Sequence, residues 1–313
     1  MSAEIEAKID KIPVLRNVVR PLKRVKLGFL EGLSLYELLE IYVIGIAEGA
    51  LTYRAAAIAF SFFMALFPFA LFVLNLIPYI PIDDFQADFL KFVEDSVPPN
   101  TYNAISSIIE DILNNSDSGL LSSGFILSIF VMANGVNSVL GGFETSQHVL
   151  VKRGFLRQYL VALLISFLLS AFLIVTVAAI VVFEVFIQSI KLENVLSESI
   201  PIMVWSRYAF LLLMILMATS ILLKFGTKHT GRRPFISVGS VFTTLLIAVS
   251  SYFFGIWVVS FANYNELYGS IGTLLVMMLY IWLNCVVLLL GFELNQVISR
   301  IKRQNLFDSF KNE

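Results

Sequence analysis

The stretch SIGTLLVMMLYIWLNCVVLLLGFELNQVISR, residues 270–300, decides the class of this protein. It begins with about twenty mostly apolar residues, the number that an α-helix needs to cross the hydrocarbon core of a bilayer. Polar residues, among them Glu293 and Arg300, then follow together. The whole chain is similar, since 58% of its 313 residues are hydrophobic and 14% are charged, against about a quarter charged in soluble globular proteins. The sequence therefore predicts an integral membrane protein.

Six stretches are long and apolar enough to cross a membrane as helices, which predicts an all-α, polytopic fold with six transmembrane helices. These stretches are residues 55–79, 119–143, 156–187, 201–225, 236–262 and 270–298. No two of them are similar enough to indicate an internal repeat. We expect residues 1–54 to form an N-terminal arm with an interfacial helix, residues 55–298 the transmembrane domain, and residues 299–313 a tail. The start of the chain does not have the pattern of a removable signal peptide.

Lysine and arginine residues predict the orientation, because positively charged loops stay on the cytoplasmic side. They concentrate before the first stretch, after the second, after the fourth and in the tail. The opposite side carries only Lys91, Lys191 and Arg207. Acidic residues gather there instead, in the loop after the first stretch. We therefore expect both ends of the chain to lie in the cytoplasm.

Two segments outside the six stretches have helical periodicity. One begins with a capping box at Ser34 and runs to about Glu48, and we expect it to lie in the inner interface or to pack on the bundle. The other is the extracytoplasmic loop 83–118, whose two apolar stripes predict short helices on either side of Pro98 and Pro99. Acidic pairs in this loop are expected to form a solvated face, and a site for a hard cation is the alternative.

Polar residues recur on one helical face in the second and the sixth stretch, in the half nearer the cytoplasm. A polar side chain inside a membrane is costly unless it faces protein or water. The two faces therefore predict a polar recess open to the cytoplasm. The alternative is tight helix packing through small residues and amide hydrogen bonds. The residues predicted to line the recess are Asn134, Asn137, Glu144, His148, Asn284 and Asn295.

Glu293 leaves the polar face of its stretch, because it lies two positions, or about 200°, from Asn295. Its depth corresponds to the inner head groups. A salt bridge that fixes helix ends is the first interpretation, with Arg54 as the partner and Arg232 or Arg233 as alternatives. A carboxylate that couples protons or ions, and simple snorkelling to the interface, are the other interpretations.

Four motifs resemble the YihY/BrkB family of bacterial inner-membrane proteins, formerly labelled ribonuclease BN. They are YRAAAIAFSFFMALFPF (53–69), NGVNSVLGGFETSQHV (134–149), GRRPF (231–235) and YGSIGTLLVMMLYIWLNCVVLLLGFELNQVI (268–298). The resemblance covers residues 34–300 and implies a six-span helical fold in the bacterial cytoplasmic membrane. It implies little chemistry, since the family is linked to serum resistance, to envelope or lipid export, and to the former nuclease label.

The residues themselves do not favour a nuclease. Such an enzyme needs clustered histidines and carboxylates for metals, or a paired acid and base. His148 and His229 lie on separate loops, Cys285 is the single cysteine, and the chain has no Walker motif for ATP. The sequence therefore predicts no enzyme, no cofactor, no metal site and no nucleic-acid partner.

Two classes of function remain. The first is a transporter or lipid-handling protein, in which Lys228, Arg232 and Arg233 contact the anionic head groups of lipids or an anionic small-molecule substrate. The preference for positive charge in cytoplasmic loops would place these residues there in any case. The second class is a non-transporting scaffold that recruits a partner through its basic N-terminal arm. Membrane lipids are the expected partners in both.

Overall fold

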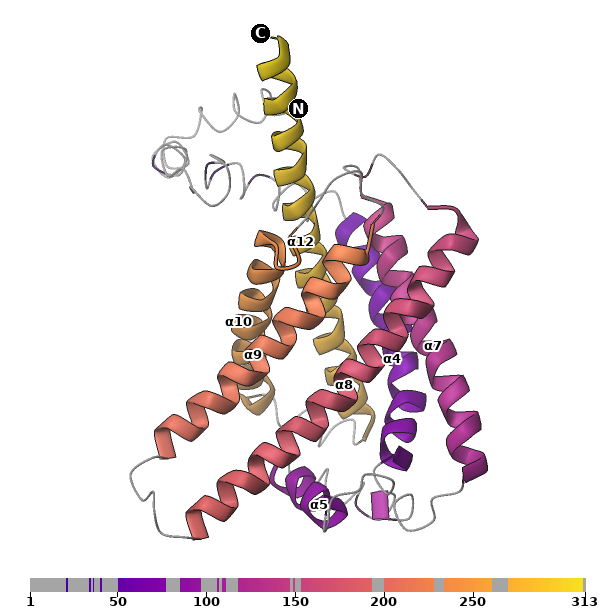
Figure 1. Ribbon diagram of the computed structural model, residues 1–313, viewed down its shortest axis with the longest axis vertical. Helices are drawn as coiled ribbons and strands as arrows, with labels where there is room; N and C mark the ends of the chain where they lie inside the picture. Colours follow the sequence, from indigo (N-terminus) through magenta and orange to yellow (C-terminus); the bar gives the residue numbers. More distant parts are fainter. Residues whose placement is uncertain are drawn as a thin grey trace.

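In the computed structural model the described helices form one bundle (Figure 1). The described residues are 21, 34, 36, 40, 50–76, 85–96, 106, 109–110, 118–146, 149, 153–192, 200–227, 234–260 and 270–311. Their helices are α4 (Ala50–Leu76), α5 (Phe85–Ser96), α7 (Ser118–Glu144), α8 (Phe155–Leu192), α9 (Ile200–Phe225), α10 (Val238–Ser260) and α12 (Ser270–Lys311). The predicted all-α polytopic fold is confirmed.

Each of the six predicted stretches corresponds to one long helix. Within the described residues, α4, α8, α9, α10 and α12 contain segments that are long and apolar enough to cross a membrane. The remaining predicted crossing, 119–143, coincides with α7, a helix of 27 residues that packs on α4 and α8. The count of six crossings stays a prediction, and the helices that it requires are present.

The largest difference between prediction and structure lies in α12. The apolar pattern ends near Ile298, but the helix continues to Lys311 and projects beyond the other helices in Figure 1. No glycine or proline follows Gly291 in this helix, so nothing in the sequence breaks the backbone hydrogen bonding. A change in polarity marks where a helix leaves the hydrocarbon, whereas the helix itself ends only where the backbone can no longer continue it.

The six long helices form a closed ring. Each helix packs on the next in the order α4, α7, α8, α9, α10 and α12, and α12 packs on α4. α7 also touches α12 across the ring, and the short helix α5 packs on α8. Successive long helices run in opposite directions, so one end of the ring gathers the first residues of α4, α8 and α10, the last residues of α7 and α9, and α12 around Glu293. We call this end the polar end.

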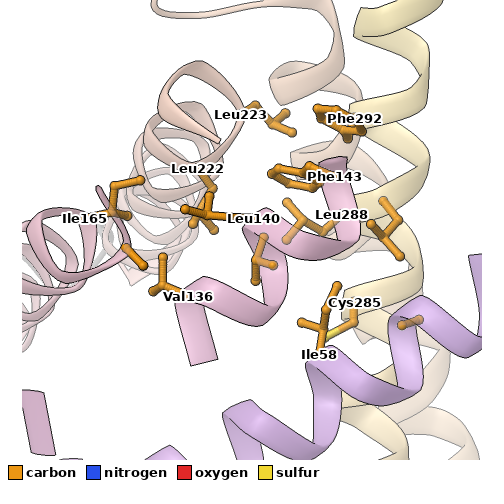
Figure 2. Packing of buried hydrophobic residues seen from close by; sticks show 14 of the residues in the cluster. Ile58, Val136, Leu140, Phe143, Ile165, Leu222, Leu223, Cys285, Leu288 and Phe292 are labelled. Atoms are coloured by element: carbon orange, nitrogen blue, oxygen red, sulfur yellow. The ribbon is translucent and has the colours of Figure 1, made fainter. Parts of the chain in front are cut away.

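The core lies in the half of the bundle next to the polar end. Side chains from five helices meet there (Figure 2). Phe143 of α7 stacks on Phe292 of α12 with ring centroids 4.1 Å apart and an interplanar angle of 7°. Apolar side chains also cover the outside, as expected where lipid is the solvent and dispersion contacts hold the helices together. The core includes Leu51, Ile58, Val136, Leu140, Ile165, Leu222, Leu223, Cys285 and Leu288.

The predicted interfacial helix and the second short helix of the loop 83–118 lie largely outside the described residues. Of the interfacial helix, residues 34–48, the structure describes three isolated positions. In the loop 83–118, α5 occupies the position of the first predicted short helix and buries Phe89. The second short helix of that loop is described only at residues 106 and 109–110.

Candidate functional site at the polar end of the bundle

The charged pair Arg54 and Glu293 joins three helices. Arg54, in the first turns of α4, donates from Nη2 to Oε1 of Glu293 at 2.9 Å, and from Nη1 to the carbonyl oxygen of Gly142 at 2.9 Å. Ser146 Oγ, just after α7, donates to the other carboxylate oxygen of Glu293 at 2.7 Å. The side chains are 15% and 13% exposed. The structure thus brings together the two residues considered first for a salt bridge, and hydrogen bonds orient both charged groups.

A second cation, Arg153, caps the C-terminal end of α9. Its guanidinium donates to the carbonyl oxygens of Phe225 at 2.9 Å and Gly226 at 3.1 Å. The last carbonyl groups of a helix lack partners within the helix and carry partial negative charge, so an arginine is favourable there. The backbone N–H of Arg153 donates to Oε1 of Glu144, which is buried. Burial lowers the pKa of Arg153, and the Glu144 carboxylate opposes this by raising it. These contacts tie the α7–α8 linker to α9.

Asn295 fastens α12 to the start of α10. Its Oδ1 accepts from the backbone N–H of Gly239 at 2.8 Å, and its Nδ2 donates to Ser237 Oγ at 2.8 Å. Ser237 and Ser240 also cap α10 reciprocally, because each hydroxyl accepts from the backbone N–H of the other residue. The N–H groups of Gly239 and Ser240, in the first turn of α10, are therefore satisfied by the side chains of Asn295 and Ser237.

The rest of the polar face of α12 also packs on α10. A Cβ atom on Gly291 would collide with Thr243 Oγ1, and one on Gly239 would collide with the carbonyl oxygen of Gly291. The two helices can approach this closely because both positions are glycine. Farther along, Tyr280 Oη and Ser251 Oγ share a hydrogen bond of 2.8 Å. This face is a seam between two helices.

The polar face of α7 lies against a different neighbour. Asn137 Oδ1 accepts from Nε2 of Gln158 in α8 at 3.0 Å. Glu144, on the same face, accepts from the α7–α8 linker. Asn134 is exposed on the surface of the bundle. The remaining predicted recess residue, His148, lies outside the described residues.

The structure therefore does not bring the two predicted polar faces together. That of α7 turns towards α8 and that of α12 towards α10, whereas α7 and α12 meet through Phe143 and Phe292. The order of helices around the ring is the physical reason, since it gives each of these helices another neighbour on its polar side. Among the recess residues, Asn284 donates from Nδ2 to the carbonyl oxygen of Tyr280 in its own helix at 2.8 Å.

Several residues of this site do not stand out in the sequence. Ser146 and Gln158 have partners that are 147 and 21 residues away, and no local pattern indicates them. Ser237 does carry a signal, because a serine directly before an apolar helical stretch is typical of a helix N-cap. The basic residues Lys228, Arg232 and Arg233 lie outside the described residues.

A ring of long apolar helices, with charged and amide groups paired at one end, defines a polytopic α-helical membrane protein. A family model described as virulence factor BrkB matches residues 45–312. The chain belongs to this BrkB family.

Relatives in several bacteria match most of the chain. YfkH of Bacillus subtilis, named as ribonuclease-like, is 29% identical over 255 residues, which cover 80% of this chain and 90% of YfkH. A UPF0761 membrane protein of Aggregatibacter aphrophilus is 21% identical, with 83% of this chain and 91% of that protein covered. One of Mannheimia succiniciproducens is 22% identical, with 82% and 87% covered. No solved structure matches the chain.

Proposed function

We propose that this protein transports lipid-like components of the cell envelope across a bacterial inner membrane, with both termini in the cytoplasm. The observation that carries the proposal is the closed ring of six helices, filled at the polar end by apolar side chains from five of them. A ring of helices around an axis is a suitable geometry for a route through the membrane. An apolar filling suits acyl chains better than ions, because ions need polar groups to replace their water.

In this proposal the structure is a closed state. The Arg54–Glu293 pair and the Phe143–Phe292 stack hold α12 against α4 and α7 at the polar end. Opening this end requires both contacts to separate, and a substrate can shift the equilibrium only by binding the open state more tightly. Lys228, Arg232 and Arg233 would attract anionic head groups to the same end. A recess lined by asparagines is not part of the proposal, because Asn137 and Asn295 are hydrogen-bonded to neighbouring helices.

A non-transporting scaffold is the second candidate. The observation that favours it is the pairing of polar side chains across helix seams, as in Asn295 with Ser237 and Tyr280 with Ser251. Such pairs stabilise one arrangement of helices. A scaffold needs a single stable arrangement, whereas a transporter must exchange two.

Neither candidate requires hydrolysis, and we expect no nuclease activity. Glu144 and Glu293, the carboxylates at the polar end that the structure describes, already accept hydrogen bonds from Arg153 and from Arg54 and Ser146. In the described part of the chain, no three His, Cys, Asp or Glu residues are grouped so that they could hold a metal ion. Incubation of the purified protein with RNA and Mg²⁺, Mn²⁺ or Zn²⁺ would test this expectation.

Lipid exchange in proteoliposomes distinguishes transport from scaffolding. The vesicles would contain fluorescent phosphatidylglycerol, and dithionite would quench the probe in the outer leaflet. We expect the wild-type chain to accelerate exchange over protein-free vesicles, and Arg54→Gln to accelerate it further because the closed state loses its ion pair. Leu245→Ala on the exposed surface of α10 is the control and should match the wild type. If neither the wild type nor Arg54→Gln exceeds protein-free vesicles, the transport proposal fails and the scaffold remains.

A further inference from the structure

The outer face of α7 carries a polar group where lipid is expected. Val136, Leu140 and Phe143 of this helix point into the core. Phe130 and Asn134, one turn apart, are exposed on the other side of the helix. Leu127 shares this exposed face at helical spacing. We call Leu127, Phe130 and Asn134 the outer face of α7.

Asn134 lies deep in the apolar part of the bundle. It precedes Glu144 by ten residues, which places it about 15 Å along the helix from the polar end. Hydrocarbon at this depth offers neither a donor nor an acceptor, so an unpaired amide is costly there. Within the described residues, the Asn134 side chain forms no hydrogen bond, whereas Asn137, Asn284 and Asn295 each form one or more.

We propose that the outer face of α7 binds a second copy of this chain across a two-fold axis, with the Asn134 amides of the two copies paired. A primary amide has both donors and an acceptor, so it is complementary to its own image across a two-fold axis. The exposed side chains beside it, Leu127 and Phe130, are uncharged and can pack between the copies without burying charge. Lipid tails could cover these two residues but would leave the amide unsatisfied.

Other exposed surfaces of the bundle serve as the comparison. Leu245, on α10, is 58% exposed, about as much as Phe130 at 54%. The exposed large side chains of α10 include Val241, Leu245, Val249, Phe253 and Ile256, which hydrocarbon satisfies, and Tyr252, whose long side chain can carry its hydroxyl towards the membrane interface. Exposure alone therefore does not distinguish the two surfaces. The unpaired amide does.

Cysteine cross-linking in native membranes tests the contact. The variants are Phe130→Cys, which keeps the amide, Asn134→Cys, and Leu245→Cys as the exposed control. The native chain serves as the blank because its single cysteine, Cys285, is buried. With a copper–phenanthroline oxidant we expect a disulfide-linked dimer at position 130 or 134 and none for Leu245→Cys or the native chain. No dimer at 130 and 134, or an equal yield at 245, would overturn the proposal.

Dimer affinity gives a second measurement that does not depend on disulfide geometry. Energy transfer between labelled C-termini in vesicles would report the dissociation constant. We expect Asn134→Leu to weaken the dimer about 10-fold or more, because the symmetric amide pair has two reciprocal hydrogen bonds and each hydrogen bond between helices in a membrane is worth about 3- to 20-fold. Asn134→Gln keeps an amide and should stay within about 3-fold of the wild type. An Asn134→Leu dimer as tight as the wild type would reject the amide pairing. Asn134 is exposed, so neither substitution disturbs the core, and neither result bears on lipid transport.

Discussion

Arg54 and Glu293 lie 239 residues apart in the chain, yet Nη2 of one is 2.9 Å from Oε1 of the other. The pair connects the first and the last long helix, α4 and α12, which are neighbours only because the ring closes. Gly142 and Ser146 supply further hydrogen bonds to the two charged groups. Removing Arg54 leaves the Glu293 carboxylate largely buried without this counter-charge, which is the costly case for an ion pair, and removing Glu293 takes one hydrogen-bonded partner from Arg54.

We expect Arg54→Gln and Glu293→Gln each to lower the free energy of unfolding by about 2–4 kcal/mol, somewhat less than for a fully buried pair. The double variant should cost less than the sum of the two, because each single change already removes the interaction. Thermal unfolding in detergent measures all three proteins. Strictly additive losses would contradict a direct interaction between the two side chains.

Gly291 tests the close approach of α10 and α12. A Cβ at this position would collide with Thr243 Oγ1. Gly291→Ala should therefore destabilise the protein by about 1–3 kcal/mol, as overpacked cores do. Gly255→Ala in α10 is the matched control, because nothing lies within 4 Å of a Cβ there. The control should be neutral or stabilise by up to about 1 kcal/mol through helix propensity. Equal effects at both glycines would argue against the seam.

Asn295 tests the side-chain cap on α10. Asn295→Leu removes the acceptor for the Gly239 N–H and the donor to Ser237 Oγ, and should cost about 1–3 kcal/mol. Hydrogen exchange of the first turn of α10 is the direct readout. Unchanged protection of the Gly239 amide in Asn295→Leu would disprove this role.

A substitution at Arg153 tests whether this side chain caps the C-terminal end of α9. Arg153→Ala frees the carbonyl groups of Phe225 and Gly226, and we expect a loss of about 1–2 kcal/mol. Proteolysis at the following linker should become faster. Arg157→Ala, four residues later on an exposed surface, is the control and should behave like the wild type. The interpretation would be wrong if the two variants were cleaved at the same rate.

Phe143 tests the core. Its side chain is fully buried and stacks on Phe292, so Phe143→Ala leaves a cavity and should cost about 3–5 kcal/mol. Phe253, 63% exposed on α10, provides a change of the same size at the surface. Phe253→Ala should cost less than about 1 kcal/mol, because lipid replaces the lost contacts. Reversal of this order in thermal unfolding would place the core elsewhere.

The long helices follow from the sequence because the requirement that sets them is local. A helix satisfies its own backbone hydrogen bonds, and hydrocarbon selects apolar side chains along it. The predicted stretch 201–225 matches α9 to within one residue, and 119–143 matches α7 to within one residue at each end. The pairing of Arg54 with Glu293 could also be predicted from the sequence, since two opposite charges expected at the same depth of a membrane have few other partners.

By itself, then, the sequence determined an all-helical membrane protein and the extent of most of its long helices. Only the tertiary structure decided which helices are neighbours, that the polar face of α12 packs on α10 and that of α7 on α8, and that Asn134 points outward. Every helix presents a similar apolar surface to its possible neighbours. The order of helices in the ring therefore depends on how all of the side chains pack together. No segment of the chain contains that information alone.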